Sequence, residues 1–371
     1  MNAAISANLV YSPGLDNVIA GETAVSSIED GLRYRGYAVG DLVERCCFEE
    51  VAYLLLHGEL PTQTQLRDMR TRLSAARGLP DSLARLLRSL PRETPGMDVA
   101  RTAMSVFAHY DPDVGDNSQA ANQRKAERLI AQMPVAIAEF HRGSHRLPSV
   151  AAREDLGHAA NFLYMLRGTA PTPAEAKAID TSLILYAEHE YNASTFTCRV
   201  ITSTESDLHS AMVGGIGALK GRLHGGANEM VLDMLQAAGN ADQAEAWLLA
   251  ILARKEKVMG FGHRVYKAGD VRAGILKPIT QSIANAAGFD AWGKTAAVIE
   301  EVMAREKNLH PNVDWPAARL YHALGIDRSL YTPMFVMARI AGWTAHVIEQ
   351  STSNRLIRPR GKYIGSGNRT I

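Results

Sequence analysis

Cysteine is scarce in this chain of 371 residues. The three cysteines are Cys46, Cys47 and Cys198, and two of them are adjacent. Adjacent cysteines do not bridge easily and lack the CxxC spacing of a zinc knuckle, so we expect neither a disulfide framework nor a cysteine metal site. Such usage is typical of a reducing compartment, and a cytoplasmic location is therefore expected.

Long apolar runs and an excess charge are missing as well. No stretch of about 18 uncharged apolar residues occurs, and no basic segment followed by an apolar run opens the chain, so neither a membrane span nor a secretion signal is expected. The 40 Lys and Arg residues nearly balance the 39 Asp and Glu residues. The sequence thus favours neither nucleic acid nor an anionic membrane as a partner, and local arginines must hold any anionic ligand.

Helical periodicity dominates what is present. Residues 48–57 form one amphipathic run, and a capping signature at residues 172–175 starts another helix. Only residues 18–37 differ, because two β-type runs, 23–28 and 32–37, flank Asp30 and Gly31, a strong hairpin turn signal. We predict an all-α protein with one short N-terminal β-hairpin.

Three separated segments break the helical pattern and carry reactive side chains. They are LHGGANE with His224, GFGH with His263, and NVD with Asp314. Each has a structural alternative, which is a glycine turn for the first, a tight loop for the second and an N-cap for Asp314. Together they fit the activation of a C–H bond beside a carbonyl, which needs a carboxylate base at the carbon and a hydrogen-bond donor at the oxygen.

Arginines supply charge of the matching sign. Arg339 lies in an apolar helix expected over residues 332–348. A buried arginine needs an anionic ligand or an ion-pair partner, for which Glu349 and Glu190 are candidates. Further arginines are Arg272, Arg355, Arg358 and Arg360. Their convergence with histidines predicts a small dicarboxylate or tricarboxylate as the ligand.

Two other motifs are set aside. Residues 214–221 (GGIGALKG) resemble a dinucleotide fingerprint superficially, but Lys220 takes the third glycine position and a helix precedes the run, which argues against a Rossmann oxidoreductase. His141 and His145 have the i,i+4 spacing of a zinc-binding helix, but Gly143 lies between them and the glutamate of HExxH is missing. We expect a solvated helix end there and no metal site.

In these residues and motifs, the chain resembles the citrate synthase family, which includes the 2-methylcitrate synthases. The resemblance extends over residues 31–37, 48–56, 187–196, 223–229, 260–266, 312–314 and 354–360. It implies a large helical domain made of residues 1–225 and 326–371, with a small helical domain of residues 226–325 inserted between them. A homodimer is implied too.

For the chemistry, the resemblance implies that His224 donates to the thioester oxygen of acetyl-CoA, Asp314 removes the methyl proton and His263 polarises the ketone of oxaloacetate. Family positions around the substrate carboxylates match His189, Arg272, Phe335, Arg339 and Arg358, the last reaching across from the partner subunit. The coenzyme A region matches Gly260, Phe261, Gly262, Lys267 and Lys307. No metal or other cofactor is implied, because the coenzyme A thioester is a substrate.

The expected reaction is citrate formation from acetyl-CoA, oxaloacetate and water. One alternative is 2-methylcitrate formation from propionyl-CoA, since one methylene group in a pocket is worth only about 1–3 kcal/mol of discrimination. A non-catalytic metabolite-binding or assembly protein is an alternative of another class, because a fold does not guarantee chemistry. The chain departs from the family at Val271, where proline usually precedes the arginine that matches Arg272, so the placement of this arginine is less constrained.

Overall fold

The structure is a computed structural model that describes residues 11–263, 266, 269–367 and 369–371. These residues form sixteen α-helices and one small sheet, which confirms the predicted all-α class. The helices are α1 (Val39–Arg45), α2 (Phe48–His57), α3 (Gln63–Ala76), α4 (Asp81–Ser89), α5 (Gly96–Phe107), α6 (Gln119–Ser144), α7 (His158–Arg167), α8 (Pro173–Tyr186), α9 (Ala193–Ser203), α10 (Leu208–Leu219), α11 (Ala227–Ala238), α12 (Ala241–Ala253), α13 (Val271–Ala286), α14 (Asp290–Lys307), α15 (Asp314–Ala323) and α16 (Tyr331–Thr352). Three short 3-10 helices are η1 (Pro13–Leu15), η2 (Ala108–Tyr110) and η3 (Arg328–Leu330).

The N-terminal sheet has one strand more than the sequence predicted. Strands β1 (Ser26–Ser27) and β2 (Arg33–Tyr34) pair antiparallel around the expected turn, where Gly31 has a φ of 89° that suits glycine. Strand β3 (Tyr37–Ala38) adds to β2, so the hairpin becomes a three-stranded meander. These strands are too short for an alternating pattern to reveal them.

Local capping explains where several helices begin and end. At α8, the Thr172 hydroxyl accepts from the amide of Glu175, and the Glu175 carboxylate accepts from the Thr172 amide, as the sequence predicted. This helix ends at Tyr186, and the chain then turns through Glu190, whose φ is 52°. The turn directs residues 187–192 towards α16 and the candidate site.

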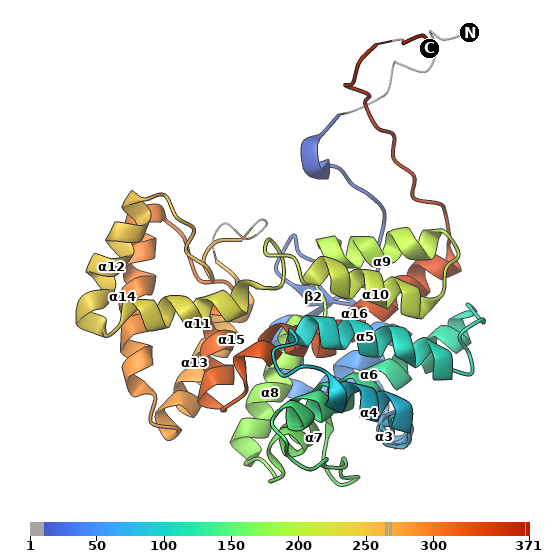
Figure 1. Cartoon of the computed structure of the whole chain (residues 1–371), viewed down its shortest axis with the longest axis horizontal. Coiled ribbons are helices and arrows are strands. Elements are labelled where there is room, and N and C mark those ends of the chain that lie inside the picture. The colour runs from blue at the N-terminus through green and yellow to red at the C-terminus, as the bar shows by residue number, and fades with distance from the viewer. Residues whose placement is uncertain (1–10, 264–265, 267–268, 368) are drawn as a thin grey trace.

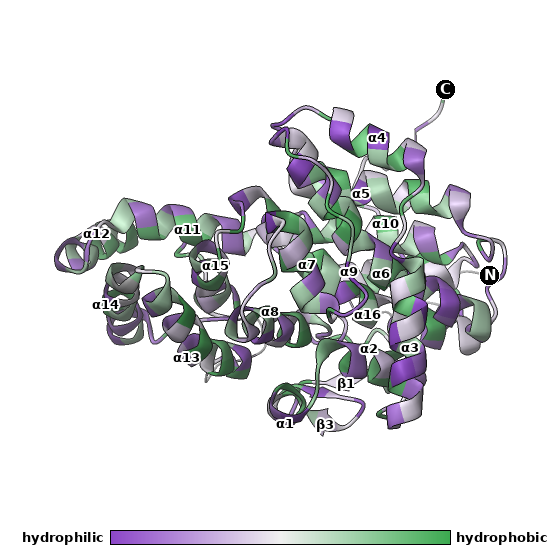
Figure 2. Ribbon diagram, turned by 90° about the horizontal axis from the view of Figure 1, so that it is seen from below, coloured by the Kyte–Doolittle hydropathy of each residue, from purple (hydrophilic) through white to green (hydrophobic). Residues whose placement is uncertain are grey.

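Helix α16 is the centre of the molecule. Nearly every one of its residues is buried, and it packs against α2, α5, α6, α8, α9 and α10. Figure 2 shows the contrast with the outer helix α3, which is largely hydrophilic. The prediction that this apolar helix is buried is confirmed, and its burial fixes Phe335 and Arg339 in position.

Helices α11 to α15 form a group of their own at one end of the molecule, with α1 to α10 and α16 at the other (Figure 1). Contacts of α13 with α8 and of α11 with α16 join the two groups. None of the described helices is both long and apolar enough to cross a membrane. The side chains singled out from the sequence lie mainly where the two groups meet.

Candidate active site

Asp314 is the first residue of α15, and its carboxylate is aimed at α8. The Tyr186 hydroxyl donates to its Oδ1 at 2.6 Å, and the Asp314 amide donates to Asn312 at 3.1 Å. The cap position belongs to Val313, so the alternative that Asp314 is an N-cap is wrong. Burial raises the pKa of Asp314 to about 6, against the opposing effects of the Tyr186 hydrogen bond and Arg272. This carboxyl group is a base poised near neutral pH.

His224 lies in the turn between α10 and α11 and is held by one serine. Its Nε2 is 2.9 Å from the Ser194 hydroxyl, which also bonds to the Asn192 side-chain oxygen at 2.7 Å. The Gly225 amide donates back to Leu219, a close approach that a side chain would obstruct. Burial, with a smaller contribution from Arg339, lowers the pKa of His224 to about 4. The imidazole is therefore neutral at pH 7.

Phe335 connects these two groups from the buried helix α16. Its ring centre is 4.4 Å from that of Tyr186 and 6.2 Å from that of His224. The Arg339 guanidinium lies 4.7 Å over the same ring, so Phe335 is the common wall behind the base, the histidine and the arginine.

Arg339 makes no direct ion pair among the described residues, although the charge of buried Glu188 acts on it. Its Nε donates to the carbonyl of Tyr186 at 2.7 Å, whereas its Nη1 is buried without a hydrogen bond. Glu349 binds Arg199 instead, at 2.6 Å, so the expected ion-pair alternative is wrong for this glutamate, and no ion pair of Arg339 with Glu190 occurs in the described structure. A buried guanidinium with an unused N–H donor is suited to bind an anion.

A cluster of aromatic and imidazole rings brings His189 beside His263. Their ring centres are 5.1 Å apart, and Tyr266 stacks on His263 at 4.6 Å. The Tyr266 amide donates to His263 Nδ1 at 3.2 Å, so the neutral ring carries its proton on Nε2. Burial, followed by Arg272 and Arg339, lowers the pKa of His189 well below its usual value. The His189 Nε2 is buried without a partner in the described structure.

Arg272 is fixed by its own neighbour rather than by a proline. Asp270 accepts from its Nε at 2.9 Å and from its Nη2 at 2.8 Å, and also accepts from the Val313 amide at 3.1 Å. Val271 is the first residue of α13 and is partly exposed. The valine therefore does not loosen this arginine, because the Asp270 carboxylate orients it and connects it to the segment that carries Asp314.

Residues 260–262 form hydrogen bonds with the loop before α15. Gly262 donates to the carbonyl of His310 at 2.9 Å, and Asn312 donates to the carbonyls of Gly260 and Gly262. Gly260 has a φ of 82°, and a side chain there would meet Val231 and Trp315. Phe261 packs on Trp315, with ring centres 4.7 Å apart. These contacts hold the segments of His263 and Asp314 together.

Known proteins resemble this chain in both sequence and structure. The protein-family model described as "Citrate synthase, C-terminal domain" matches residues 14–360. This chain belongs to the citrate synthase family. It is 46% identical over 361 residues to the 2-methylcitrate synthase of Mycobacterium tuberculosis, covering 96% of this chain and 91% of that one. It is also 46% identical to citrate synthase 2 of Bacillus subtilis, covering 95% of each chain. Its relatives are acyltransferases, and the prediction of an enzyme is confirmed.

Solved citrate synthases share the fold. The structure from Thermotoga maritima superposes with a TM-score of 0.88 at 37% identity and 98% coverage of both chains. A ternary complex of the Thermoplasma acidophilum enzyme with carboxymethyl coenzyme A and oxaloacetate superposes with a TM-score of 0.93 at 32% identity, again with 98% of both chains covered. The all-helical fold of the family is thereby established for this member.

Not every residue that the family resemblance singled out reaches this site within one chain. Arg358 lies in the exposed tail after α16, which Figure 1 shows running away from the helices. Lys307 is exposed in the last turn of α14. Lys267 falls outside the described residues. These three positions therefore remain predictions.

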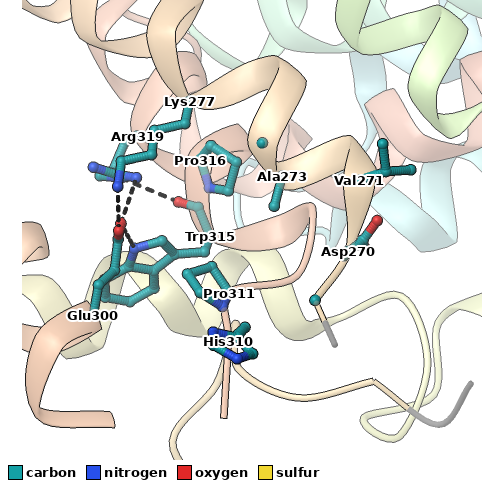
Figure 3. Close-up of a pocket in the computed structure, with 12 residues that line it drawn as sticks. Asp270, Val271, Ala273, Lys277, Glu300, His310, Pro311, Trp315, Pro316 and Arg319 are labelled. Carbon is teal, nitrogen blue, oxygen red and sulfur yellow. Dashed lines mark hydrogen bonds and ion pairs between the residues drawn. The ribbon is translucent and has the colours of Figure 1, made fainter. Parts of the chain in front are cut away.

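Two cavities lie near the site and have different linings. One of about 220 Å³ is lined by His263, Tyr266 and Asp270 and so opens on the ring cluster. A larger one of about 380 Å³, shown in Figure 3, lies where Trp315 and Arg319 both bond to Glu300. Its lining contains neither His224 nor Asp314. The lining of the smaller cavity lacks both residues as well but includes His263, so this cavity is the one that reaches a candidate site residue.

Three supporting residues were missed from the sequence. Tyr186 binds the base, Ser194 binds His224 and Asp270 orients Arg272. Asp270 was within reach, since an acidic residue two positions before a buried arginine is a local signal. Tyr186 and Ser194 gave none, because their partners lie 128 and 30 residues away along the chain.

Proposed function

We propose that this protein condenses acetyl-CoA with oxaloacetate and water to give citrate and free coenzyme A. One observation carries the proposal: the unpaired Nη1 of buried Arg339 lies beside the wall that joins Asp314 to His224. A carboxylate substrate would satisfy this donor, and the base and the neutral histidine would then act on a second substrate next to it.

In the first step, Asp314 takes a proton from the methyl carbon of acetyl-CoA. The C–H electron pair becomes the carbon–carbon double bond of the enol, and the carbonyl π pair moves onto the thioester oxygen, to which His224 donates. A carboxyl group with a pKa of about 6 is mostly ionised at pH 7 and is a stronger base than an ordinary aspartate.

The direction of the hydrogen bond between Ser194 and His224 decides which tautomer of His224 is present in this step. The single proton of the Ser194 hydroxyl has two acceptors in reach, the Asn192 oxygen and His224 Nε2. When the proton goes to Nε2, the neutral imidazole keeps its own proton on Nδ1, which then donates to the thioester oxygen. The Trp343 indole donates to the same hydroxyl oxygen at 3.1 Å and so holds the serine in place.

In the second step, the enol carbon attacks the ketone of oxaloacetate and His263 donates from Nε2 to the ketone oxygen. Arg339, Arg272 and His189 hold the oxaloacetate carboxylates, with Phe335 as the wall behind them. Water then cleaves the thioester and releases citrate and coenzyme A. None of these steps calls for a metal or a further cofactor, because the bond-making electrons come from the C–H bond.

For the acyl-CoA side and the assembly, the proposal follows the family. Lys307 and Lys267 would meet the coenzyme A phosphates, and residues 260–262 would line its approach. Residues 226–325 would close on the larger remainder, which the separate packing of α11 to α15 supports. Arg358, exposed on the tail of one chain, would complete the site of a second copy.

The deciding experiment is thiol release measured in parallel from acetyl-CoA and propionyl-CoA, with and without oxaloacetate. We expect oxaloacetate-dependent release with the higher kcat/KM for acetyl-CoA. A propionyl preference would establish 2-methylcitrate synthesis, the second candidate, which the 46% identity to a 2-methylcitrate synthase favours. No thiol release from either thioester would contradict both candidate reactions and would favour the non-catalytic alternative.

A further inference from the structure

A second group of chemically reactive side chains lies outside this site. His141 and His145 lie one turn apart at the C-terminal end of α6, and Asp327 caps η3 in the connector between α15 and α16. One ligand atom from each lies within 4.8 Å of the others, and His145 Nε2 is 3.7 Å from Asp327 Oδ2. All three residues are half-buried, so the group is both held and accessible.

The His145 ring and the Asp327 carboxylate are oriented by hydrogen bonds on their far sides. His145 Nδ1 lies 2.8 Å from the carbonyl of His141, which only accepts, so Nδ1 carries the proton and Nε2 presents its lone pair to Asp327. Asp327 Oδ1 accepts from the Ser329 amide at 2.9 Å and from its hydroxyl at 2.7 Å, which leaves Oδ2 for His145. Two lone pairs that face each other at 3.7 Å are suited to a cation between them.

His141 completes the ligand set. Its ring centre is 4.4 Å from that of His145, one turn further along α6. A backbone carbonyl that fixes the tautomer and a serine that fixes the carboxylate are the outer partners usual at metal sites.

We propose that His141, His145 and Asp327 bind a divalent transition-metal ion, with water in the remaining positions. Two imidazoles and one carboxylate form a ligand set that Zn²⁺ uses in proteins. Bonds of about 2.0–2.2 Å place tetrahedral ligand atoms about 3.3 Å apart, which small side-chain rotations would reach from the present separations. This site is independent of the proposed condensation reaction.

The sequence did not reveal this site because the third ligand, Asp327, is far along the chain from His141 and His145. His141 and His145 alone lack the HExxH glutamate, and the expectation of no metal site followed from that local view. The fold supplies a carboxylate from the connector that leads from α15 into α16. A bound ion would join the end of α6 to this connector and stabilise both.

The test is equilibrium binding of Zn²⁺ to the metal-free full-length protein, with the unfolding temperature measured alongside. We expect one ion per chain at this site and a Tm that rises with Zn²⁺ concentration. His141→Gln, His145→Gln and Asp327→Asn should each lower the affinity more than about tenfold, because losing even an outer partner of a ligand costs 10–100-fold.

Matched controls keep the outcome specific. His109→Gln removes an exposed histidine of another element, and His263→Gln removes an imidazole of the candidate active site; both variants should keep the ion. Metal-free Tm values near that of the parent protein show that a variant is folded. Absence of Zn²⁺ binding would overturn the proposal, as would an ion that stays in the three ligand variants or is lost in His263→Gln. The three side chains would then be a polar contact that binds no ion.

Discussion

At the scale of the residue, Asp314 shows how burial makes a base from an ordinary side chain. The raised pKa depends on position, since a solvated aspartate titrates near its usual 3.8. The balance between burial and the Tyr186 hydrogen bond sets the value near 6. The pH dependence of the reaction rate should therefore reflect the ionisation of Asp314.

Asp314→Asn should lower kcat of thiol release by about 10²–10⁴-fold, because the amide cannot accept the proton. Oxaloacetate binding, measured by calorimetry, should stay within about threefold of the parent value. In the parent protein, kcat/KM should fall tenfold per pH unit below about pH 6, where the carboxylate is protonated. A variant with full activity would show that another group is the base.

The same variant makes a stability prediction that separates lost chemistry from lost folding. The folded pKa of Asp314 is raised, so its favourable contribution is present below about pH 4 and is lost as pH rises through about 6. Asparagine does not ionise, so Asp314→Asn should be more stable than the parent protein at pH 7.5, on the order of 2 kcal/mol in the free energy of unfolding. Urea unfolding at pH 4 and 7.5 measures the difference.

Tyr186→Phe should shift the acid limb of kcat/KM to higher pH. The lost hydrogen bond lowers the pKa of Asp314 in the parent protein, so removing it raises that pKa further. Tyr321→Phe is the matched control, since this buried tyrosine bonds to Ser182 instead. Equal shifts in both variants would argue against a specific role for Tyr186 in positioning and tuning the base.

At the scale of the element, α16 depends on one glycine where residues 187–188 cross it. A Cβ at Gly342 would lie 2.2 Å from the Glu188 carboxylate and 2.3 Å from the carbonyl of Ala187. Gly342→Ala should therefore destabilise the protein by about 1–3 kcal/mol or more and disturb the nearby His189. Denaturant unfolding and the KM for oxaloacetate measure the two effects.

Gly217→Ala in α10 is the control for that substitution. Nothing lies within 4 Å of a Cβ at Gly217, so the alanine gains helix propensity without a clash. It should stabilise by about 0.4–1 kcal/mol, chiefly by restricting the unfolded chain. If both substitutions acted alike, close packing of α16 would not be the cause.

For the whole molecule, the open question concerns Arg358, which in a single chain lies away from the other candidate site residues. If it completes the site of a partner, Arg358→Ala and Asp314→Asn homodimers should both be nearly inactive. Mixed dimers made by co-expression should recover activity, up to about half of the parent value per mixed dimer, because one of their two sites is intact. No recovery in purified mixed dimers would place Arg358 in the site of its own chain.

The predictability of the fold differed between kinds of element. The capping box at Thr172 and the apolar run over residues 48–57 identified helix bounds correctly, because such signals involve residues three or four apart. The third strand was missed, since two residues carry no period. No local breaker marks the end of α8 at Tyr186, where tertiary contacts turn the chain.

The amino-acid sequence alone predicts the helical class, the reactive residue types and, through residues 31–37 to 354–360, the family. Those properties lie in local chemistry and in ordered motifs. The folded chain was needed to show that Arg339 makes no direct ion pair among the described residues, that Tyr186 binds Asp314, and that Asp327 lies beside His141 and His145. Burial and contacts between distant segments set pKa values and ligand sets, and neither is a property of any local stretch of sequence.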